Sequence, residues 1–312
     1  MKDLSRWGYV LFILFILLAP LGMDPRWMAI GTTFLVFSVV ALSEDIVLGK
    51  GGMFNMGHAL FFGLGAYTTA ICNIHFDMPI IYTFPLAVLI PALFGIILAG
   101  PIVHLRGDYL LVTTIGFNIV FVQAVQNNIF DLTGGPNGIF GIDVPRIFGF
   151  AFMSQTSIYY LALAVLLLTL FIMRNLENSK AGRALHYLRE DHIAAQSIGI
   201  NFRVYRIFAF SLGAGIAGLA GSVYAIQFSA VSPEGFDFIQ SVLFFSIVIV
   251  GGSSIPGVLL GVFVMFVLPE IFREFATWRY FVFGIAMILT MVLRPRGIWP
   301  AKFGRIPDYI KG

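Results

Sequence analysis

The chain has 312 residues, of which 59% are hydrophobic and only 11% are charged, and 33 of them are Phe. Soluble domains average roughly 45 to 50% apolar and about 25% charged residues, so this composition excludes an ordinary soluble protein and predicts a membrane protein. The net charge of +3 is too small to suggest a nucleic-acid partner. The single cysteine, Cys72, excludes a disulfide framework and a cysteine-based metal site, and no metal site is expected.

Runs without Asp, Glu, Lys or Arg predict the membrane-spanning helices, because a hydrocarbon core about 30 Å thick needs roughly 20 apolar residues per helix. We expect an all-α polytopic membrane protein with about ten transmembrane helices, and any number from eight to ten is compatible with the sequence. They lie near residues 8–23, 27–43, 53–74, 79–103, 109–130, 157–173, 207–227, 239–251, 255–269 and 280–293. The first run lacks a convincing signal-peptide cleavage site, so we expect a retained helix. The breakers in 251–257 suit a tight hairpin or a re-entrant loop.

The distribution of basic residues predicts that the N- and C-termini are both cytoplasmic. With ten spans in that orientation, fifteen of the nineteen Lys and Arg residues fall on the cytoplasmic side. The exceptions are Arg26, Arg146, Arg273 and Arg279. Such an asymmetry follows the positive-inside rule. Ten helices use most of the chain, so we expect residues 1–312 to form a single transmembrane domain.

Two kinds of residue distinguish particular spans. Small residues gather in the third and seventh spans, including Gly213, Ala217 and Gly221 at four-residue intervals, and small residues let helix backbones pack closely in lipid. The fifth span carries a polar load of Thr113, Thr114, Asn118, Gln123, Gln126, Asn127 and Asn128. Because amides in a membrane helix must face protein or water, this span is predicted to line a translocation path or a subunit interface.

Ionisable residues do not lie deep in any of these predicted spans. Proton-coupled carriers usually need one as a relay, so its absence argues against a proton-driven carrier, although a sodium site built from carbonyls and hydroxyls remains open. The chain also lacks a phosphate-binding loop, since its only Gly-Lys pair, Gly49-Lys50, has Glu44 where the motif requires Gly. Any ATPase is therefore expected to be a separate polypeptide.

Two connections are longer than turns. The inner one, about 174–206, places apolar residues at three- and four-residue intervals among charged ones, which predicts short amphipathic helices that end at Gly199. A helix lying along the membrane surface and a docking surface are both open for it. The outer one, about 131–156, begins with a cluster of residues suited to positive φ and tight turns. Two interpretations are open for this outer connection: a structured turn, or an outer rim of the protein that touches a substrate-delivery partner.

Several stretches together resemble the inner-membrane permeases of branched-chain amino-acid ABC importers, of the LivM type. They are residues 52–67, 105–109 with 133–138, 182–185 with 194–200, 231–233, 251–252 and 294–298. Asn55 stands where the family commonly has Ser, and Met53 where Gln is frequent. Ile193 stands where the wider ABC docking pattern has Glu, and residues 208–210 replace its later Ile-x-Leu-Pro. The resemblance covers nearly the whole chain and is to the divergent amino-acid branch.

The resemblance implies the rest of the machine. Expected partners are a second, homologous permease subunit, two ABC ATPase subunits, an extracytoplasmic substrate-binding protein and membrane lipid. The chain itself would bind no cofactor, and ATP and Mg would be used by the partner ATPases. The location implied is the bacterial cytoplasmic (inner) membrane, with several passes. This subunit would be non-catalytic.

The resemblance and the polar pattern also nominate three sets of residues. The set for ATPase docking, within 174–206, is Gly182, Arg183, Ala184, Leu185, Arg189, Ala194, Ala195 and Gly199. The set for the translocation path is Asn55, His58, Tyr67, Asn118, Gln123 and Asn127. The set for the outer rim is Thr133, Gly134, Gly135, Pro136 and Asn137.

Two alternatives remain. A similar permease could carry urea, short amides or other amino acids. A self-sufficient ion-coupled carrier or channel would transport without partners and without ATP. A membrane-embedded enzyme is disfavoured because the five histidines lie apart in the sequence, without a His-Glu-x-x-His pair.

Overall fold

A computed structural model describes residues 24–105, 107–147 and 150–271, together with residues 20, 22, 281, 284–285, 288, 292–294 and 297–299. Most of the first and tenth predicted spans, Arg106 and both chain termini lie outside the described residues. The expectation of cytoplasmic termini and the count of eight to ten spans therefore remain predictions.

The described part of the chain is built almost entirely from helices. They are α2 (Pro25–Asp45) continued by the π-helical turn η2 (Ile46–Lys50), α3 (His58–Ile74), α4 (Ile80–Ile102), α5 (Asp108–Gln126), α6 (Gln155–Asn178), α7 (Lys180–Glu190), α8 (His192–Ser197), α9 (Phe202–Phe228), α10 (Phe238–Gly251), α11 (Ile255–Val262), the π-helical turn η6 (Phe263–Val267) and α12 (Leu268–Ile271). Within the described residues, six helical segments are long and apolar enough to cross a membrane: Pro25–Lys50, Ile80–Ile102, Asp108–Gln126, Gln155–Asn178, Phe202–Phe228 and Pro233–Gly251. The predicted all-helical membrane architecture is confirmed at this level.

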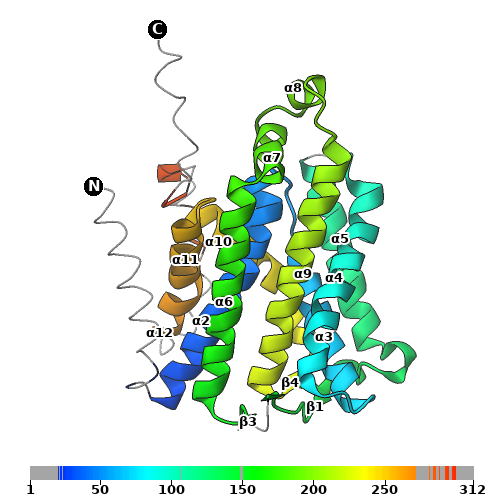
Figure 1. Ribbon diagram of the computed structural model, residues 1–312, viewed down its shortest axis with the longest axis vertical. Coiled ribbons are helices and arrows are strands. Elements are labelled where there is room, and N and C mark those ends of the chain that lie inside the picture. The colour runs from blue at the N-terminus through cyan, green and yellow to red at the C-terminus, as the bar shows by residue number, and fades with distance from the viewer. Residues whose placement is uncertain are drawn as a thin grey trace.

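The long helices run side by side, with α9 between the α2–α6 pair and the α3–α4 pair (Figure 1). Helices α7 and α8 project at one end of the bundle, which we call the α8 end. The described residues form four two-residue strands at the opposite end, which we call the strand end. Strand β1 (Ile139–Phe140) pairs with β4 (Ala230–Val231), and β2 (Arg146–Ile147) pairs with β3 (Phe150–Ala151), both antiparallel.

Glycine residues allow α9 to lie very close to its neighbours, as the spacing of small residues predicted. A Cβ atom on Gly65 of α3 would lie 2.0 Å from the carbonyl oxygen of Gly218. A Cβ on Gly221 would lie 2.0 Å from the carbonyl oxygen of Phe62. Only the absence of side chains permits these approaches, which place the backbones of α3 and α9 in contact.

Two boundaries differ from the predicted spans for a physical reason. The second helical segment continues through Lys50 instead of ending at residue 43, because its charged residues are paired inside the bundle. Helix α3 begins at His58 instead of residue 53, after a non-helical stretch that we call the 51–57 segment. This segment contains three of the glycines that lower helix propensity, and the chain turns within it.

Candidate functional site

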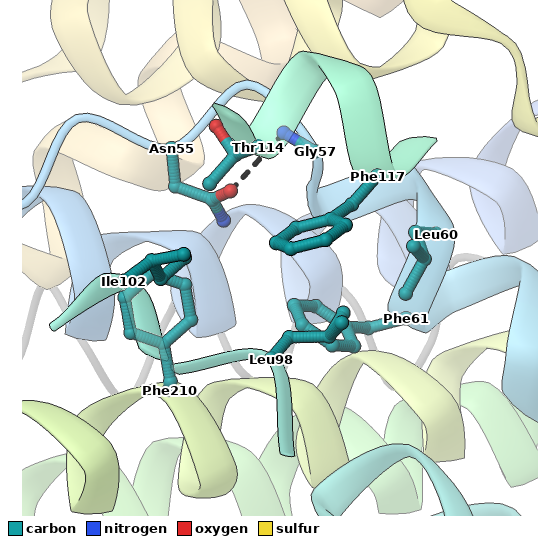
Figure 2. Close-up of a pocket in the computed structure, with 9 residues that line it drawn as sticks. All are labelled: Asn55, Gly57, Leu60, Phe61, Leu98, Ile102, Thr114, Phe117 and Phe210. Atoms are coloured by element: carbon teal, nitrogen blue, oxygen red, sulfur yellow. Dashed lines mark hydrogen bonds between the residues drawn. The ribbon is translucent and has the colours of Figure 1, made fainter. Parts of the chain in front are cut away.

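A small pocket lies between α3, α4, α5 and α9. Its walls are Asn55 and Gly57 of the 51–57 segment, Leu60 and Phe61 of α3, Leu98 and Ile102 of α4, Thr114 and Phe117 of α5, and Phe210 of α9. Figure 2 shows the amide of Asn55 near Thr114 on one side and the apolar side chains across from them. The cavity between these walls has a volume of only about 10 Å³, no more than one water molecule needs. Small-molecule sites typically span about 300–1,000 Å³, so the pocket of this chain alone is below that range.

Asn55 is held in the pocket wall by a buried polar cluster. Its Nδ2 donates to Oε2 of Glu44 at 3.1 Å and lies 3.1 Å from Nδ1 of His58. Its Oδ1 accepts a hydrogen bond from the backbone N–H of Gly57 at 3.1 Å, the dashed line in Figure 2. The ring of His58 lies between two further partners, with Nδ1 2.7 Å from Glu44 Oε2 and Nε2 2.7 Å from the hydroxyl of Ser43. Two of the predicted path residues, Asn55 and His58, are thus brought together.

Glu44 corrects one expectation drawn from the sequence. The predicted spans contained no ionisable residue, yet Glu44 and Asp45 are fully buried within the continuous helical segment that ends at Lys50. An apolar run ends at its first acidic residue, whereas the helix continues because these carboxylates find partners elsewhere in the sequence. The absence of a buried ionisable group therefore no longer argues against a proton-driven carrier.

A second charged cluster lies one turn further along the same helical segment. The ammonium group of Lys50 is 3.4 Å from Oδ2 of Asp45 and 2.6 Å from Oε1 of Glu177, near the end of α6. Lys50 is only 6% exposed and Asp45 is fully buried, whereas the Glu177 side chain is 40% exposed. Pairing allows these charges to lie inside the bundle, where an isolated charge would be costly.

Tyr67 and Asn118 lie together around Phe236, away from the pocket lining. The rings of Tyr67 and Phe236 are 5.9 Å apart, and Asn118 Nδ2 donates to the carbonyl oxygen of Phe236 at 3.3 Å. Both side chains are buried, and in the described part of the chain the Tyr67 hydroxyl and Asn118 Oδ1 have no hydrogen-bond partner. The structure therefore separates this pair of predicted path residues from Asn55 and His58.

The last two predicted path residues lie on the surface near the end of α5. Gln123 and Asn127 are both exposed, and the only bond recorded for the described Gln123 side chain goes to Gln126, at 3.4 Å. They continue an exposed face of α5 that includes Tyr109, Val112 and Val120. This helix was predicted to line either a translocation path or a subunit interface. Thr114 lies in the pocket wall, as a path requires, whereas the exposed amides of Gln123 and Asn127 suit a subunit interface.

The predicted docking residues fall on α7, α8 and the turn that follows. Ala184, Leu185 and Ala195 are buried and anchor these two helices, and Gly199 has the positive φ (+85°) that ends α8. Ala194 is exposed at the tip of the molecule, beside Ile193 (66% exposed) and Ile198 (69% exposed). The predicted connection narrows to residues 179–201, because α6 and α9 extend further than their predicted spans.

Gly182, Arg183 and Arg189 make contacts within this chain. A Cβ on Gly182 would lie 2.1 Å from the carbonyl oxygen of Leu176, so Gly182 permits the tight turn from α6 into α7. Arg183 Nη1 donates to the carbonyl oxygen of Asn178 at 3.0 Å. Arg189 Nη1 donates to the carbonyl oxygen of Gly49 in η2.

The predicted outer rim forms a compact turn at the strand end. The side chain of Asn128 organises it, because its Oδ1 accepts from the backbone N–H groups of Thr133 and Gly134 at 3.1 and 2.9 Å. Thr133 and Gly135 are buried, whereas Gly134, Pro136 and Asn137 are exposed. Positive φ angles at Gly134 (+71°) and Gly135 (+62°) confirm the tight turning predicted for this stretch.

Motifs that are distant in the sequence meet in two places. A Cβ on Gly138 would lie 2.1 Å from the carbonyl oxygen of Val231, so the outer turn packs against β4. Near the α8 end, the backbone N–H groups of Ile298 and Trp299 donate to the carbonyls of Val250 and Gly251 at 2.8 and 3.0 Å. Helices α10 and α11 pack against each other across 251–257, as either the predicted hairpin or the predicted re-entrant loop requires.

Sequence reasoning missed Ser43, Glu44, Asp45 and Lys50. A signal was present, because Glu44 and Asp45 follow an apolar run without any basic neighbour before Lys50. An acidic pair in that position must find its partners in the tertiary structure or stay in water. Asn128 was noted only as part of a polar helix, although Asn is the side chain that most readily adopts left-handed φ and caps a turn.

The family described as "Branched-chain amino acid transport system / permease component" matches residues 27–291. The high-affinity branched-chain amino acid transport system permease protein LivM of Salmonella typhimurium is 33% identical over 295 residues, which cover 87% of this chain and 69% of that protein. The corresponding LivH protein of the same organism is 25% identical and covers 84% and 90%. The nucleoside ABC transporter permease protein NupC of Lactococcus lactis is 25% identical and covers 86% and 93%. No solved structure matches the chain.

The family match, the LivM relative and the apolar helices agree on one kind of protein. Permease components are non-catalytic, and the helices indicate a multi-pass membrane protein. The chain belongs to the family of branched-chain amino acid transport permease components.

Proposed function

We propose that this chain is one of two permease subunits of an ATP-driven importer that moves branched-chain or similar amino acids inward across the bacterial cytoplasmic membrane. A substrate-binding protein delivers the amino acid from outside, two ABC ATPases supply the energy, and ATP and Mg are used by those ATPases alone. The observation that carries the proposal is the family match over residues 27–291 together with the projecting α7–α8 unit.

The α8 tip is the proposed ATPase-docking surface. Ile193, Ala194 and Ile198 expose apolar surface on α8 and the turn after it, which project from the end of the bundle. Exposed apolar side chains away from lipid favour a protein partner. Closure of the ATPases would pull on α7 and α8, and rigid-body rocking of the two permease subunits would move the amino acid inward.

The pocket is proposed as part of the translocation path. Leu60, Leu98, Ile102 and three Phe rings form an apolar wall suited to a branched aliphatic side chain. Its volume is below that of a typical ligand site. We infer that the second permease subunit completes the path, and the exposed amides of Gln123 and Asn127 on α5 are candidates for that interface.

The strand end is proposed as the surface that meets the binding protein. Gly134, Pro136 and Asn137 are exposed there on a turn held by Asn128. A turn fixed by its own hydrogen bonds loses little conformational entropy when a partner binds, which suits a recurring docking event.

A pull-down from native cells tests the assembly. The tagged chain is extracted in mild detergent, and the bound proteins are identified by mass spectrometry. We expect a Walker-motif ATPase and a second hydrophobic permease. Ile193→Asp should lose the ATPase and keep the second permease. Met153→Asp, at a more exposed position at the strand end (77% against 66%), should keep both partners. Recovery of this chain alone, folded and reproducibly, would favour a self-sufficient carrier.

The cargo is tested separately by uptake competition in cells that express the whole system. Leucine, isoleucine and valine should compete with each other for uptake. Urea, short amides and nucleosides are included because similar permeases carry other cargo, as the name of the NupC relative illustrates. Competition by one of these and by none of the branched amino acids would reassign the cargo.

A further inference from the structure

The 51–57 segment contacts both the proposed docking unit and the pocket. It follows η2, and its first backbone N–H groups stay bonded to that turn: Gly51 to Ile46 at 3.0 Å and Gly52 to Leu48 at 3.1 Å. Its last residues lead into α3 and form part of the pocket wall. The segment therefore lies between the two regions and contacts both of them.

At the α8 end, helix α7 lies directly against the segment. Gly52 has φ +64°, and a Cβ there would lie 2.9 Å from Cγ and 3.3 Å from Cα of Arg189. The guanidinium of the same Arg189 donates to the carbonyl oxygen of Gly49. Contact of Gly52 with the backbone of α7 means that α7 cannot approach further without displacing the segment.

At the pocket end, the segment is attached to α5 and to the buried polar cluster. The backbone N–H of Met56 donates to Thr114 Oγ1 at 3.1 Å. A Cβ on Gly57 would lie 2.3 Å from the carbonyl oxygen of Thr114. Asn55 is held by Glu44 and His58 at 3.1 Å each, so any shift of the segment moves a polar side chain of the pocket.

Two features of η2, the turn just before the segment, bear on how movement of α7 reaches the 51–57 segment. The ammonium of Lys50 joins η2 to Glu177 at the end of α6, one residue before the turn into α7. The turn η2 is π-helical, and π-helical turns within α-helices are uncommon and often occur at functional sites. The helix is thus already irregular at the point where α7 contacts it.

We propose that Arg189 is a positioning residue for transport, which couples movement of α7 to the 51–57 segment and through it to Asn55 in the pocket wall. This inference rests on the proposed function. It differs from the docking role predicted for Arg189 from the sequence, because the guanidinium binds this chain and not the partner.

A thiol probe on the segment tests the coupling. Cys72 is the only cysteine of this chain, so Cys72→Ser leaves this subunit without a thiol, and labelling is read from the mass of this subunit alone. Phe54→Cys then places one thiol on the segment at a side chain that is 43% exposed. The labelling rate with N-ethylmaleimide is measured on the complete detergent-purified assembly, without nucleotide and with ATP plus vanadate. We expect a several-fold difference between the two states.

Adding Arg189→Ala should abolish this difference and uncouple ATP hydrolysis from uptake, with hydrolysis retained. Arg189→Lys keeps a donor near the Gly49 carbonyl, so it should restore part of the labelling difference and part of the coupling between hydrolysis and uptake. The matched control is Lys180→Ala, which removes an exposed basic residue of the same helix. It should keep the labelling difference and the coupling of hydrolysis to uptake. Size-exclusion profiles establish that each variant is assembled.

The remaining outcomes overturn the inference. Labelling that is independent of nucleotide in the parent would show that the segment does not move with the ATPases. Nucleotide dependence that survives Arg189→Ala would show that Arg189 does not couple α7 to the segment. These results are distinguishable from failure of the proposed function, in which no ATPase co-purifies and no ATP-dependent uptake is measured for the parent.

Discussion

Glu44 shows how one residue organises a region assembled from distant parts of the sequence. Its carboxylate accepts from Asn55 and contacts His58, and both of these lie beyond the turn that follows η2. A buried acceptor with two buried partners is far more expensive to remove than to keep, because each partner would be left without its hydrogen bond.

Glu44→Ala should therefore lower the free energy of unfolding by about 1–3 kcal/mol or more, since it leaves buried polar groups unsatisfied. Glu44→Gln keeps an acceptor and should cost less. The measurement is the thermal midpoint of the purified chain in detergent. Glu177→Ala is the matched control and should lower the free energy of unfolding by about 1 kcal/mol or less. The Glu177 side chain is 40% exposed, and Lys50 keeps its ion pair with Asp45 in this variant. Equal losses for Glu44→Ala and Glu177→Ala would contradict the buried cluster.

At the scale of elements, the contact between α3 and α9 depends on glycine. The two helices are also joined by a hydrogen bond from Thr69 Oγ1 to Ser222 Oγ at 2.7 Å, which needs the close approach. A side chain at the contact would separate the helices and break this bond.

Gly65→Val should prevent α3 and α9 from packing and reduce the yield of folded protein, because its Cβ would lie 2.0 Å from the Gly218 carbonyl oxygen. Gly116→Ala is the comparison, since a Cβ on Gly116 of α5 has no atom within 4 Å. It should fold normally. Size-exclusion chromatography measures the folded, monodisperse fraction of each variant. Normal folding of Gly65→Val would show that α9 tolerates a wider separation.

Helix α8 depends on its first capping residue. The Asp191 carboxylate accepts from the backbone N–H groups of Ile193 and Ala194 at 2.8 and 3.1 Å. These hydrogen bonds, led by that of Ala194, hold the pKa of the Asp191 carboxyl below its ordinary value. The cap therefore stabilises α8 fully above the ordinary pKa of Asp, and this stabilisation is lost as the pH falls through the lowered pKa.

Asp191→Ala should increase amide hydrogen exchange at Ile193 and Ala194 at neutral pH and remove the pH dependence of helix α8. Asp191→Asn should keep most of the protection, because Asn is an equally good capping residue. Hydrogen exchange followed by mass spectrometry of the 190–200 peptide measures the effect. Unchanged protection in Asp191→Ala would mean that packing of the buried Ala195 alone maintains α8.

At the scale of the whole molecule, the bundle has two chemically different ends. The α8 end carries the exposed basic residues of α6 and α7, Arg174, Lys180 and Arg183, whereas the strand end carries the short paired strands and the Asn128 turn. From the positive-inside rule we predict that the α8 end faces the cytoplasm.

Single thiols test this orientation in the Cys72→Ser background. Asn137→Cys at the strand end should react with a membrane-impermeant maleimide in intact cells, because Asn137 is exposed there. Ser197→Cys at the end of α8 should react only after the membrane is permeabilised. Reaction of both thiols in intact cells, or the reverse pattern, would overturn the orientation.

The amino-acid sequence by itself determined the class of protein, most helix positions and the short helices before Gly199. Those properties depend on composition and on local periodicity, which are written in neighbouring residues. The tight turn at Gly134 and Gly135 was predictable for the same reason, since glycine is the residue that adopts positive φ without strain.

Only the tertiary structure decided where the charges and the pocket lie. The Glu44–His58 contact spans fourteen residues with a change of direction between them, and the pocket draws its walls from four helices and the 51–57 segment. Arg189 contacts Gly49 across 140 positions. Such pairings depend on the close approach of whole helices, which the glycines permit but which no local pattern specifies.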